Sequence, residues 1–207
     1  MCAISLDSIK SMLRDASAIL LEHSQHLTDL DQEIGDGDMG ITMAKIAGVF
    51  LGDEVQNSSE ADIGKFLMAT GMAVNRSAAS TIGTLTATAF MRGGKEVRGE
   101  IQLTPPQVAS VLSAAVQGIQ DRGKAKLGDK TIIDALHPAA AKFTDAISTG
   151  STVAMATCDA AAAAEAGRDK VTPLRSKIGR AGWVGERTIG KVDTGCEMAV
   201  LVLKALA

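Results

Sequence analysis

The sequence has 207 residues, a formal net charge of −3 and no tyrosine. This length suits a single domain, residues 1–207, that buries a sizeable core without disulfides. The near-neutral charge, without basic blocks, argues against nucleic acid as a partner, and no apolar run reaches the ~20 residues of a membrane span. Alanine, leucine and methionine are plentiful and β-branched alternation is rare, which predicts an all-α protein.

The three cysteines are Cys2, Cys158 and Cys196, far apart and without the spacing of metal ligands. They are typical of reduced thiols, so we expect a cytoplasmic protein. The first residues lack the basic and apolar regions of a signal peptide, which agrees with that expectation.

Apolar residues recur at helical spacing through most of the chain, beginning with residues 5–27. Further helices are predicted over residues 40–51, 61–77, 85–91, 104–120, 131–147, 151–166 and 194–206. Gly93-Gly94 is predicted to cap the end of one helix, and Thr104-Pro105-Pro106 to begin the next. The total is about eight helices, without an evident linker or repeat.

After the first helix comes the run DLDQEIGDGDMG, residues 29–40, which holds five acids and three glycines. Carboxylates this close repel one another unless a cation lies among them. Mg²⁺ takes a few carboxylates and shares the rest of its coordination shell with water and substrate phosphates. The run ends at a predicted helix N-terminus, which favours phosphate. It therefore favours a magnesium site that holds a nucleotide.

Two other interpretations of the acidic run compete with this one. A Gly/Asp stretch is more often a solvated loop or a helix cap, and that alternative stays open from these residues alone. A calcium EF-hand loop is excluded. Counted from Asp36, it needs an oxygen ligand at Gly40, a glycine at Ile41 and a glutamate at Ala47.

Three later segments are candidates for phosphate contact. Residues 77–84 are small and rich in hydroxyls, and either approach phosphate or form a small-residue helix contact. Residues 123–131 resemble a P-loop but have Asp129 before Lys130, so they are either a basic inter-helix loop or a loop whose lysines, Lys124 and Lys130, approach phosphate. Residues 178–195 hold five glycines and two arginines, which suit phosphate oxygens or a surface lid with Arg–Glu pairs.

Four motifs in order resemble the ADP-binding L subunit of the dihydroxyacetone kinase family, over nearly the whole chain. The motifs are LTDLDQEIGDGD (27–38), GM (71–72) with the small residues that follow, RGKA (122–125) with GDKT (128–131), and GRA (179–181) with GERTIG (185–190) and Asp193. The resemblance implies a barrel of eight antiparallel helices with the nucleotide at one end.

The resemblance also implies roles for individual residues. Asp31, Asp36 and Asp38 match three aspartates that hold two Mg²⁺ ions, which bridge the phosphates of ADP or ATP. We expect Arg180 to neutralise phosphate charge, and count it with these aspartates as catalytic. The positions that match nucleotide contacts are Met39, Gly40, Ile41, Thr42, Thr81, Ile82, Gly123, Ile132, Arg180, Asp193, Thr194 and Gly195.

Such subunits pair with a K subunit, which holds a short ketose such as dihydroxyacetone through its own histidine. The L subunit supplies the phosphoryl group. Bound ADP is either recharged in place by a phosphotransferase-system phosphocarrier or exchanged for ATP.

The chain departs from the family pattern at three places. Met39 stands where histidine is usual, residues 79–83 replace a Gly-Gly-x-Ser-Gly run, and Thr194 replaces a proline. Two other functions therefore stay open, namely a kinase for another C3–C4 ketose and a non-catalytic Mg-ADP-binding regulatory module. A plain helical scaffold, which binds no nucleotide, is the third alternative.

Overall fold

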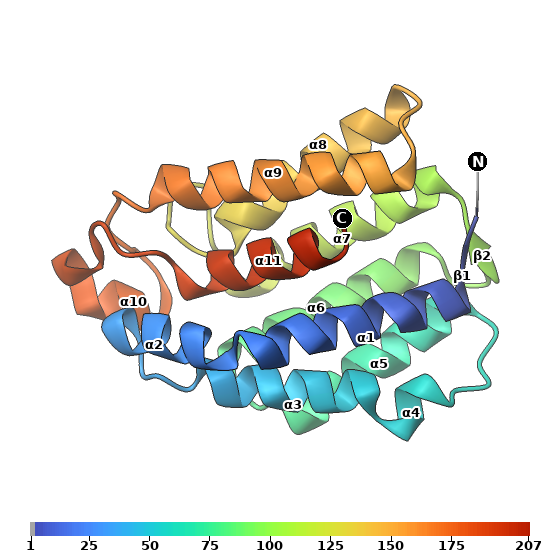
Figure 1. Cartoon of the computed structure of the whole chain (residues 1–207), viewed down its shortest axis with the longest axis horizontal. Helices are drawn as coiled ribbons and strands as arrows, with labels where there is room; N and C mark the ends of the chain where they lie inside the picture. The colour runs from blue at the N-terminus through green and yellow to red at the C-terminus, as the bar shows by residue number, and fades with distance from the viewer. Residues whose placement is uncertain (1–2) are drawn as a thin grey trace.

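The computed structural model describes residues 3–207, which are almost entirely helical (Figure 1). The helices are α1 (Leu6–Glu22), α2 (Ser24–Ile34), α3 (Met39–Leu51), α4 (Asp53–Gln56), α5 (Ile63–Ser77), α6 (Thr81–Glu96), α7 (Pro105–Gly123), α8 (Ile133–Ser148), α9 (Val153–Val171), α10 (Gly179–Val184), the 3₁₀-helix η1 (Gly185–Thr188) and α11 (Thr194–Ala205). The strands β1 (Ile4–Ser5) and β2 (Gln102–Leu103) form one short antiparallel pair. The all-α prediction is confirmed.

Eight of these helices close into a ring. In order around the ring they are α1, α3, α5, α6, α7, α8, α9 and α11, each packed on the next, and α11 packs back on α1. Neighbours run in opposite directions because consecutive helices join at alternating ends of the barrel (Figure 1). The expected barrel of antiparallel helices is confirmed.

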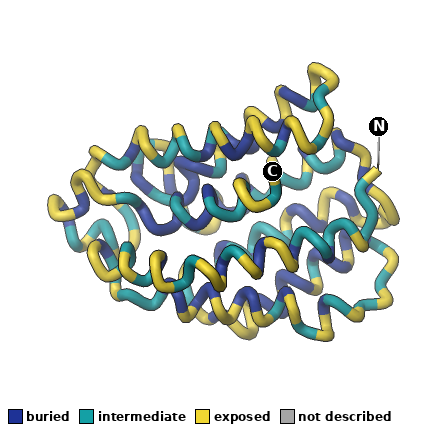
Figure 2. Tube along the Cα trace, in the orientation of Figure 1, coloured by how far each residue is buried: buried dark blue, intermediate teal, exposed yellow. Residues whose placement is uncertain are grey.

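Buried apolar residues form one core shared by the helices of the ring. Buried and exposed residues alternate along these eight helices (Figure 2). Fully buried members include Leu27, Met43, Ile46, Ile63, Phe66, Val74 and Val200. Removing such side chains from water supplies most of the stabilisation of a helical barrel.

Several helix boundaries differ from the sequence prediction; α6, for example, begins at Thr81 rather than residue 85, and α9 continues to Val171 rather than residue 166. The helix expected over residues 5–27 is divided at His23, so Asp31 lies on α2 rather than in the following loop. The predicted cap at Gly93-Gly94 is wrong, because α6 continues to Glu96. There a Cβ on Gly94 would lie 2.6 Å from the carbonyl oxygen of Gly64, so glycine lets α5 and α6 approach closely.

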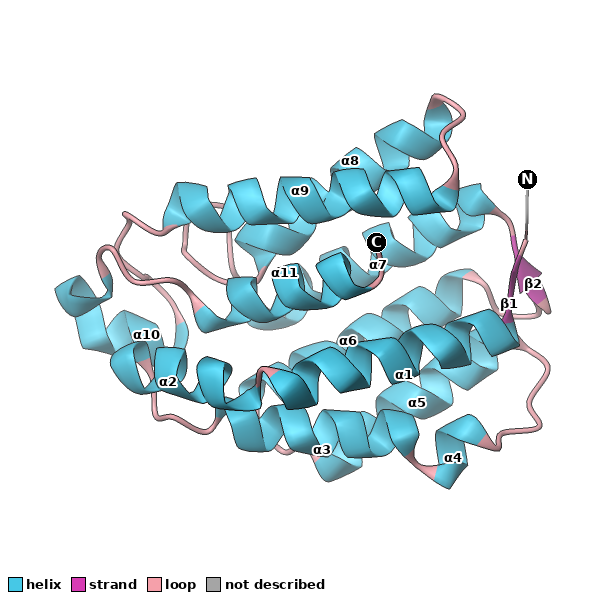
Figure 3. Ribbon diagram, in the orientation of Figure 1, coloured by secondary structure: helices cyan, strands magenta, loops and turns pink. Residues whose placement is uncertain are grey.

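Helix termini gather at the end of the barrel opposite β1 and β2. α2 and α7 end there, and α3, α6, α8, α10 and α11 begin there; the connecting loops are pink in Figure 3. Within residues 3–207, no helix is both long and apolar enough to cross a membrane. Cys158 and Cys196 are free thiols, and Cys2 lies outside the described residues.

Candidate functional site

Three aspartates meet where α2 passes into α3. Asp31 lies in the last turn of α2, Asp36 in the connecting loop, and Asp38 at the N-cap of α3. One carboxylate oxygen from each lies within 4.8 Å of the others. The Oδ2 atom of Asp31 also accepts a hydrogen bond of 3.0 Å from the backbone N–H of Asp38. The sequence-predicted cluster is therefore brought together.

Glycines allow this tight arrangement. Gly35 ends α2, and its N–H donates to the carbonyl oxygen of Asp31 at 2.6 Å. A Cβ on Gly35 would lie only 2.3 Å from Oδ1 of Asp31, so any side chain there displaces the carboxylate. Gly37 adopts a φ of +76°, a conformation that glycine reaches without steric cost.

Arg180, at the start of α10, faces the aspartates from the other side. Its guanidinium forms an ion pair with Asp36, and its Nη1 atom lies 3.6 Å from Oδ2 of Asp38. Both partners are about half exposed, so the pair adds little to stability. The ion pair places a side-chain cation beside the clustered carboxylate oxygens.

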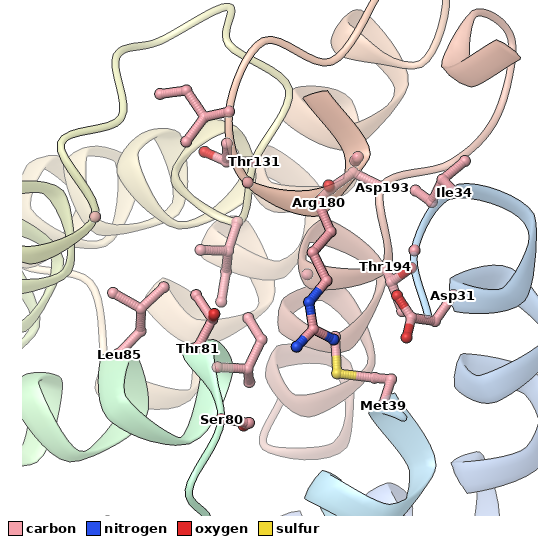
Figure 4. A pocket seen from close by; sticks show the side chains of 18 of the residues that line it. Asp31, Ile34, Met39, Ser80, Thr81, Leu85, Thr131, Arg180, Asp193 and Thr194 are labelled. Carbon is pink, nitrogen blue, oxygen red and sulfur yellow. The ribbon is translucent and has the colours of Figure 1, made fainter. Parts of the chain in front are cut away.

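Beside the cluster lies a cavity of about 200 Å³. Figure 4 shows Arg180 reaching into it, with Asp31, Asp193 and Thr194 to one side and Ser80, Thr81 and Leu85 to the other. Leu85, Ile119 and Ile132 make one wall apolar, whereas the aspartates make the other acidic. A ligand with an apolar ring and a charged tail matches this division.

Thirteen of the fifteen predicted site residues line the cavity. They are Asp31, Asp36, Asp38, Met39, Thr42, Thr81, Ile82, Gly123, Ile132, Arg180, Asp193, Thr194 and Gly195. Gly40 and Ile41 do not, because Met39 and Thr42 share the inward face of α3 at helical spacing. Ile41 is 62% exposed, and Gly40 packs on α2, with its N–H donating to Thr28 Oγ1 at 3.2 Å.

Several further lining residues were not assigned a role of their own from the sequence, although all but Leu85, Ile119 and Ile133 lie in the acidic run or in the three candidate segments. They are Ile34, Gly35, Ser80, Leu85, Ile119, Ala125, Thr131, Ile133, Ile178, Gly179 and Ala181, together with Lys130, which was predicted only as a phosphate contact. Helical spacing could have identified two of these residues. Leu85 follows Thr81 by one helical turn and Ile119 precedes Gly123 by one, so each shares a helix face with a predicted site residue.

The small-residue stretch, residues 77–84, forms the turn into α6 and one wall of the cavity. Ser80 caps α6, with its Oγ atom accepting from the N–H of Gly83 at 3.0 Å. A Cβ on Gly83 would lie 2.0 Å from the carbonyl oxygen of Ala78, which requires glycine there. Thr81 and Ile82 meanwhile line the cavity.

Asp193 is the buried acid of the site. It caps α11 by accepting the N–H of Cys196 at 2.8 Å. Burial raises the pKa of Asp193 to about 6, although this hydrogen bond and Lys130 favour its charged form. Burial also raises the pKa of the Cys196 thiol, whose sulfur lies 3.0 Å from the carbonyl oxygen of Thr131. Cys196 is therefore a packed thiol rather than a nucleophile.

Lys130 does not approach phosphate in the way the glycine-rich loop had indicated. It is 1% exposed, and its Nζ atom donates to three backbone carbonyls. Lys124 is exposed, ends α7 in a left-handed conformation and does not line the cavity.

The aspartate cluster fits magnesium by its chemistry. All three donors are carboxylate oxygens, the ligands that a hard cation prefers, and they leave one side open toward the cavity. Asp31, Asp36 and Asp38 would hold the metal.

Comparison with known proteins places the chain in a family. The model of the DAK2 domain matches residues 33–207. The PEP-dependent dihydroxyacetone kinase ADP-binding subunit DhaL of Escherichia coli K12 is 29% identical over 99% of this chain and 97% of its own. The corresponding subunit 1 of Listeria innocua is 32% identical over 94% and 91%. The L-erythrulose kinase of Pectobacterium atrosepticum is 30% identical over 96% of this chain but only 34% of its own.

Solved structures agree with these relatives. The native dihydroxyacetone kinase of C. freundii superposes with a TM-score of 0.74 at 25% identity, over 96% of this chain. Its complex with AMP-PNP and Mg²⁺ gives 0.73 at 22% identity, a likeness of fold. This chain spans about a third of that kinase chain, 34%. The chain belongs to the DAK2 domain family, and it resembles the ADP-binding subunits of dihydroxyacetone kinases over nearly its whole length.

Proposed function

We propose that this chain binds ADP and ATP with magnesium, as the two ions that the family resemblance implies, and passes a phosphoryl group to a short ketose held by a partner K subunit. The observation that carries the proposal is the cluster of Asp31, Asp36 and Asp38, whose oxygens lie within 4.8 Å of one another at the acidic wall of the cavity.

In this proposal the acidic wall of the cavity contacts the metal and the phosphates, and the apolar wall contacts the base. Asp31, Asp36 and Asp38 would hold the magnesium, which would supply positive charge to the nucleotide phosphates. Arg180 adds a positive charge beside these aspartates. Helix N-termini at α3 and α11 favour the phosphates. The apolar wall at Ile82, Leu85 and Ile132 receives the base.

The ketose is assigned to another polypeptide. Relatives of the same length are named ADP-binding subunits, whereas the C. freundii kinase chain is about three times as long. The remaining part of that longer chain therefore has room for a sugar site, and here a K subunit supplies it. The phosphoryl donor is either exchanging ATP or a phosphocarrier protein that recharges bound ADP.

A second candidate is a kinase for another C3–C4 ketose. It is favoured by the 30% identity to an L-erythrulose kinase over 96% of this chain. Met39 also distinguishes this chain from the usual family pattern, which has histidine at this position. Met39 is 6% exposed and lines the cavity next to the aspartate cluster.

Reconstitution tests the proposal. The purified chain is combined with the K subunit of its own organism, dihydroxyacetone or erythrulose, and either ATP or a phosphorylated carrier protein. We expect a ketose phosphate only when both subunits and magnesium are present. If the chain binds ADP in the presence of magnesium but transfers no phosphoryl group from either donor, the result supports the alternative of a non-catalytic regulatory module. Absence of Mg-dependent nucleotide binding would contradict the proposal itself.

A further inference from the structure

Lys130 is a buried lysine whose charge is met by backbone oxygens. Its Nζ atom donates to the carbonyl oxygens of Thr172 at 2.8 Å, Leu174 at 2.9 Å and Thr188 at 2.5 Å. An ammonium has three N–H donors, so all three are used. Lys130 also has a φ of +63°, an uncommon conformation for a residue other than glycine. Such strain persists only where the surrounding structure enforces it.

The three acceptors belong to one segment, residues 172–190, here called the cover segment. Two acceptors lie where the segment begins and the third near its end, so one ammonium joins the two ends. Two further hydrogen bonds join the beginning and the end of the cover segment, which together form its base. The N–H of Gly190 donates to the carbonyl of Thr172 at 3.0 Å, and that of Ser176 to Thr188 Oγ1 at 2.9 Å.

The middle of the cover segment reaches the site. It contains α10 and η1, both of which pack on α2, the helix that carries Asp31. Ile178, Gly179, Arg180 and Ala181 line the cavity, and Arg180 pairs with Asp36. Lys130 is therefore at the base of the cover segment and Arg180 at the part that meets the aspartates.

We propose that Lys130 is a positioning residue, whose ammonium holds the cover segment closed so that Arg180 reaches Asp36 and Asp38. A buried ammonium is costly without partners, so opening the segment's base strips Lys130 of the carbonyls that make its burial tolerable. The exposed lysines of the same loop, Lys124 and Lys126, make no such connection to the segment. The consequence for nucleotide affinity rests on the proposed function; the closure of the segment does not.

Limited trypsin digestion of the full-length chain without nucleotide tests the closure. The cover segment and the residue after it supply cleavage sites at Arg175, Lys177, Arg180, Arg187 and Lys191. We expect Lys130→Met to accelerate cleavage there about tenfold or more, with cleavage after Arg98, at the far end of the barrel, unchanged. Lys126→Met, the same change at an exposed lysine, should match the wild type.

Lys130→Gln provides a second variant that keeps a donor group without a charge. It should give intermediate cleavage, since an amide has two N–H donors for three carbonyls. Wild-type cleavage rates in both variants would overturn the proposal. So would acceleration that is equal after Arg98, because that result indicates general destabilisation rather than opening of one segment.

A double-mutant cycle tests the link to Arg180. Lys130→Met should weaken Mg-ADP binding about tenfold in the wild-type background and have little further effect in Arg180→Ala, since residues of one network are not additive. Equal losses in both backgrounds would overturn the positioning role. If the wild type binds no Mg-ADP, the proposed function fails, and the trypsin result still decides the closure by Lys130.

Discussion

The guanidinium of Arg180 pairs with the carboxylate of Asp36, so two loops from opposite ends of the chain meet over one cavity. Asp38 lies close to the same guanidinium, with 3.6 Å between the nearest charged atoms. Arg180 therefore lies beside the carboxylates that would also hold the proposed magnesium.

Asp36→Asn should remove Mg-dependent ADP binding without unfolding the protein. Asp36 is exposed, so its loss leaves the core intact. Affinity should fall at least about 100-fold, the upper end of the loss seen when an outer-shell partner of a metal is removed. Isothermal titration calorimetry with Mg-ADP measures it. Asp159→Asn, an exposed aspartate on α9, is the matched control, and equal affinities of the two variants would contradict the metal assignment.

Arg180→Ala should change two affinities in opposite directions. Removing the cation beside the aspartates strengthens binding of Mn²⁺ alone, by up to about fivefold for an exposed pair. Binding of Mg-ADP should weaken about tenfold or more, because a charged hydrogen bond to phosphate is lost. Electron paramagnetic resonance of Mn²⁺ and calorimetry with ADP measure the two. Arg187→Ala, exposed in the same segment, should alter neither; parallel losses in Arg180→Ala would contradict a separate phosphate role.

Gly35→Ala should abolish metal binding without changing a ligand. Its Cβ would lie 2.3 Å from Asp31 Oδ1, so the carboxylate must move out of the cluster. Gly48→Ala on α3 is the control, because nothing lies within 4 Å of its added Cβ. We expect Gly48→Ala to bind metal normally and to gain about 0.5–1 kcal/mol of stability. Retained Mn²⁺ binding by Gly35→Ala would mean that Asp31 is not a ligand.

The raised pKa of Asp193 predicts that the free energy of unfolding depends on pH. Burial raises its pKa to about 6 from an ordinary value of 3.8, so the folded protein binds this proton more tightly than the unfolded chain. Its contribution is fully present below the ordinary pKa and is lost as the pH rises through about 6. Asp193→Asn keeps a capping residue and removes the titration. Its stability relative to wild type should rise by about 3 kcal/mol between pH 3 and pH 7.

Urea titrations between pH 3 and pH 7 measure the stability of each variant, and Asp62, which caps α5, provides the opposite case. The N–H of Lys65 lowers the pKa of Asp62, so its contribution is present at neutral pH and is lost on acidification. Asp62→Asn should therefore lose stability relative to wild type as the pH rises. If the difference in stability between Asp193→Asn and the wild type does not change with pH, burial does not raise the pKa of Asp193, and the prediction is contradicted.

The acidic half of the site was predicted in two steps. The run of five acids among glycines before a helix indicated a metal site but left a solvated loop open, and the family resemblance singled out Asp31, Asp36 and Asp38, whose oxygens lie together in the structure. The arginines of the aperiodic, glycine-rich segment suited either anion contact or a surface lid, and the family resemblance singled out Arg180. The helical periodicity likewise marked the helices of the barrel.

The errors concern contacts that only tertiary structure determines. Gly93-Gly94 reads as a helix end, yet the neighbouring α5 explains why glycine is needed in mid-helix. Lys130 reads as an exposed lysine of a basic loop, but a left-handed turn directs it inward to carbonyls more than 40 residues away in the chain. Ile41 was included because the family resemblance matches the whole run from Met39 to Thr42 with nucleotide contacts, while helical rotation turns Ile41 to solvent.

The most direct measurement is anomalous diffraction from crystals grown with ADP and Mn²⁺, which accepts the same oxygen ligands as magnesium. The account predicts a metal peak bonded to the carboxylates of Asp31, Asp36 and Asp38, with the diphosphate beside it in the cavity. Ordered ADP with no metal among these carboxylates, or metal bound elsewhere, would contradict it.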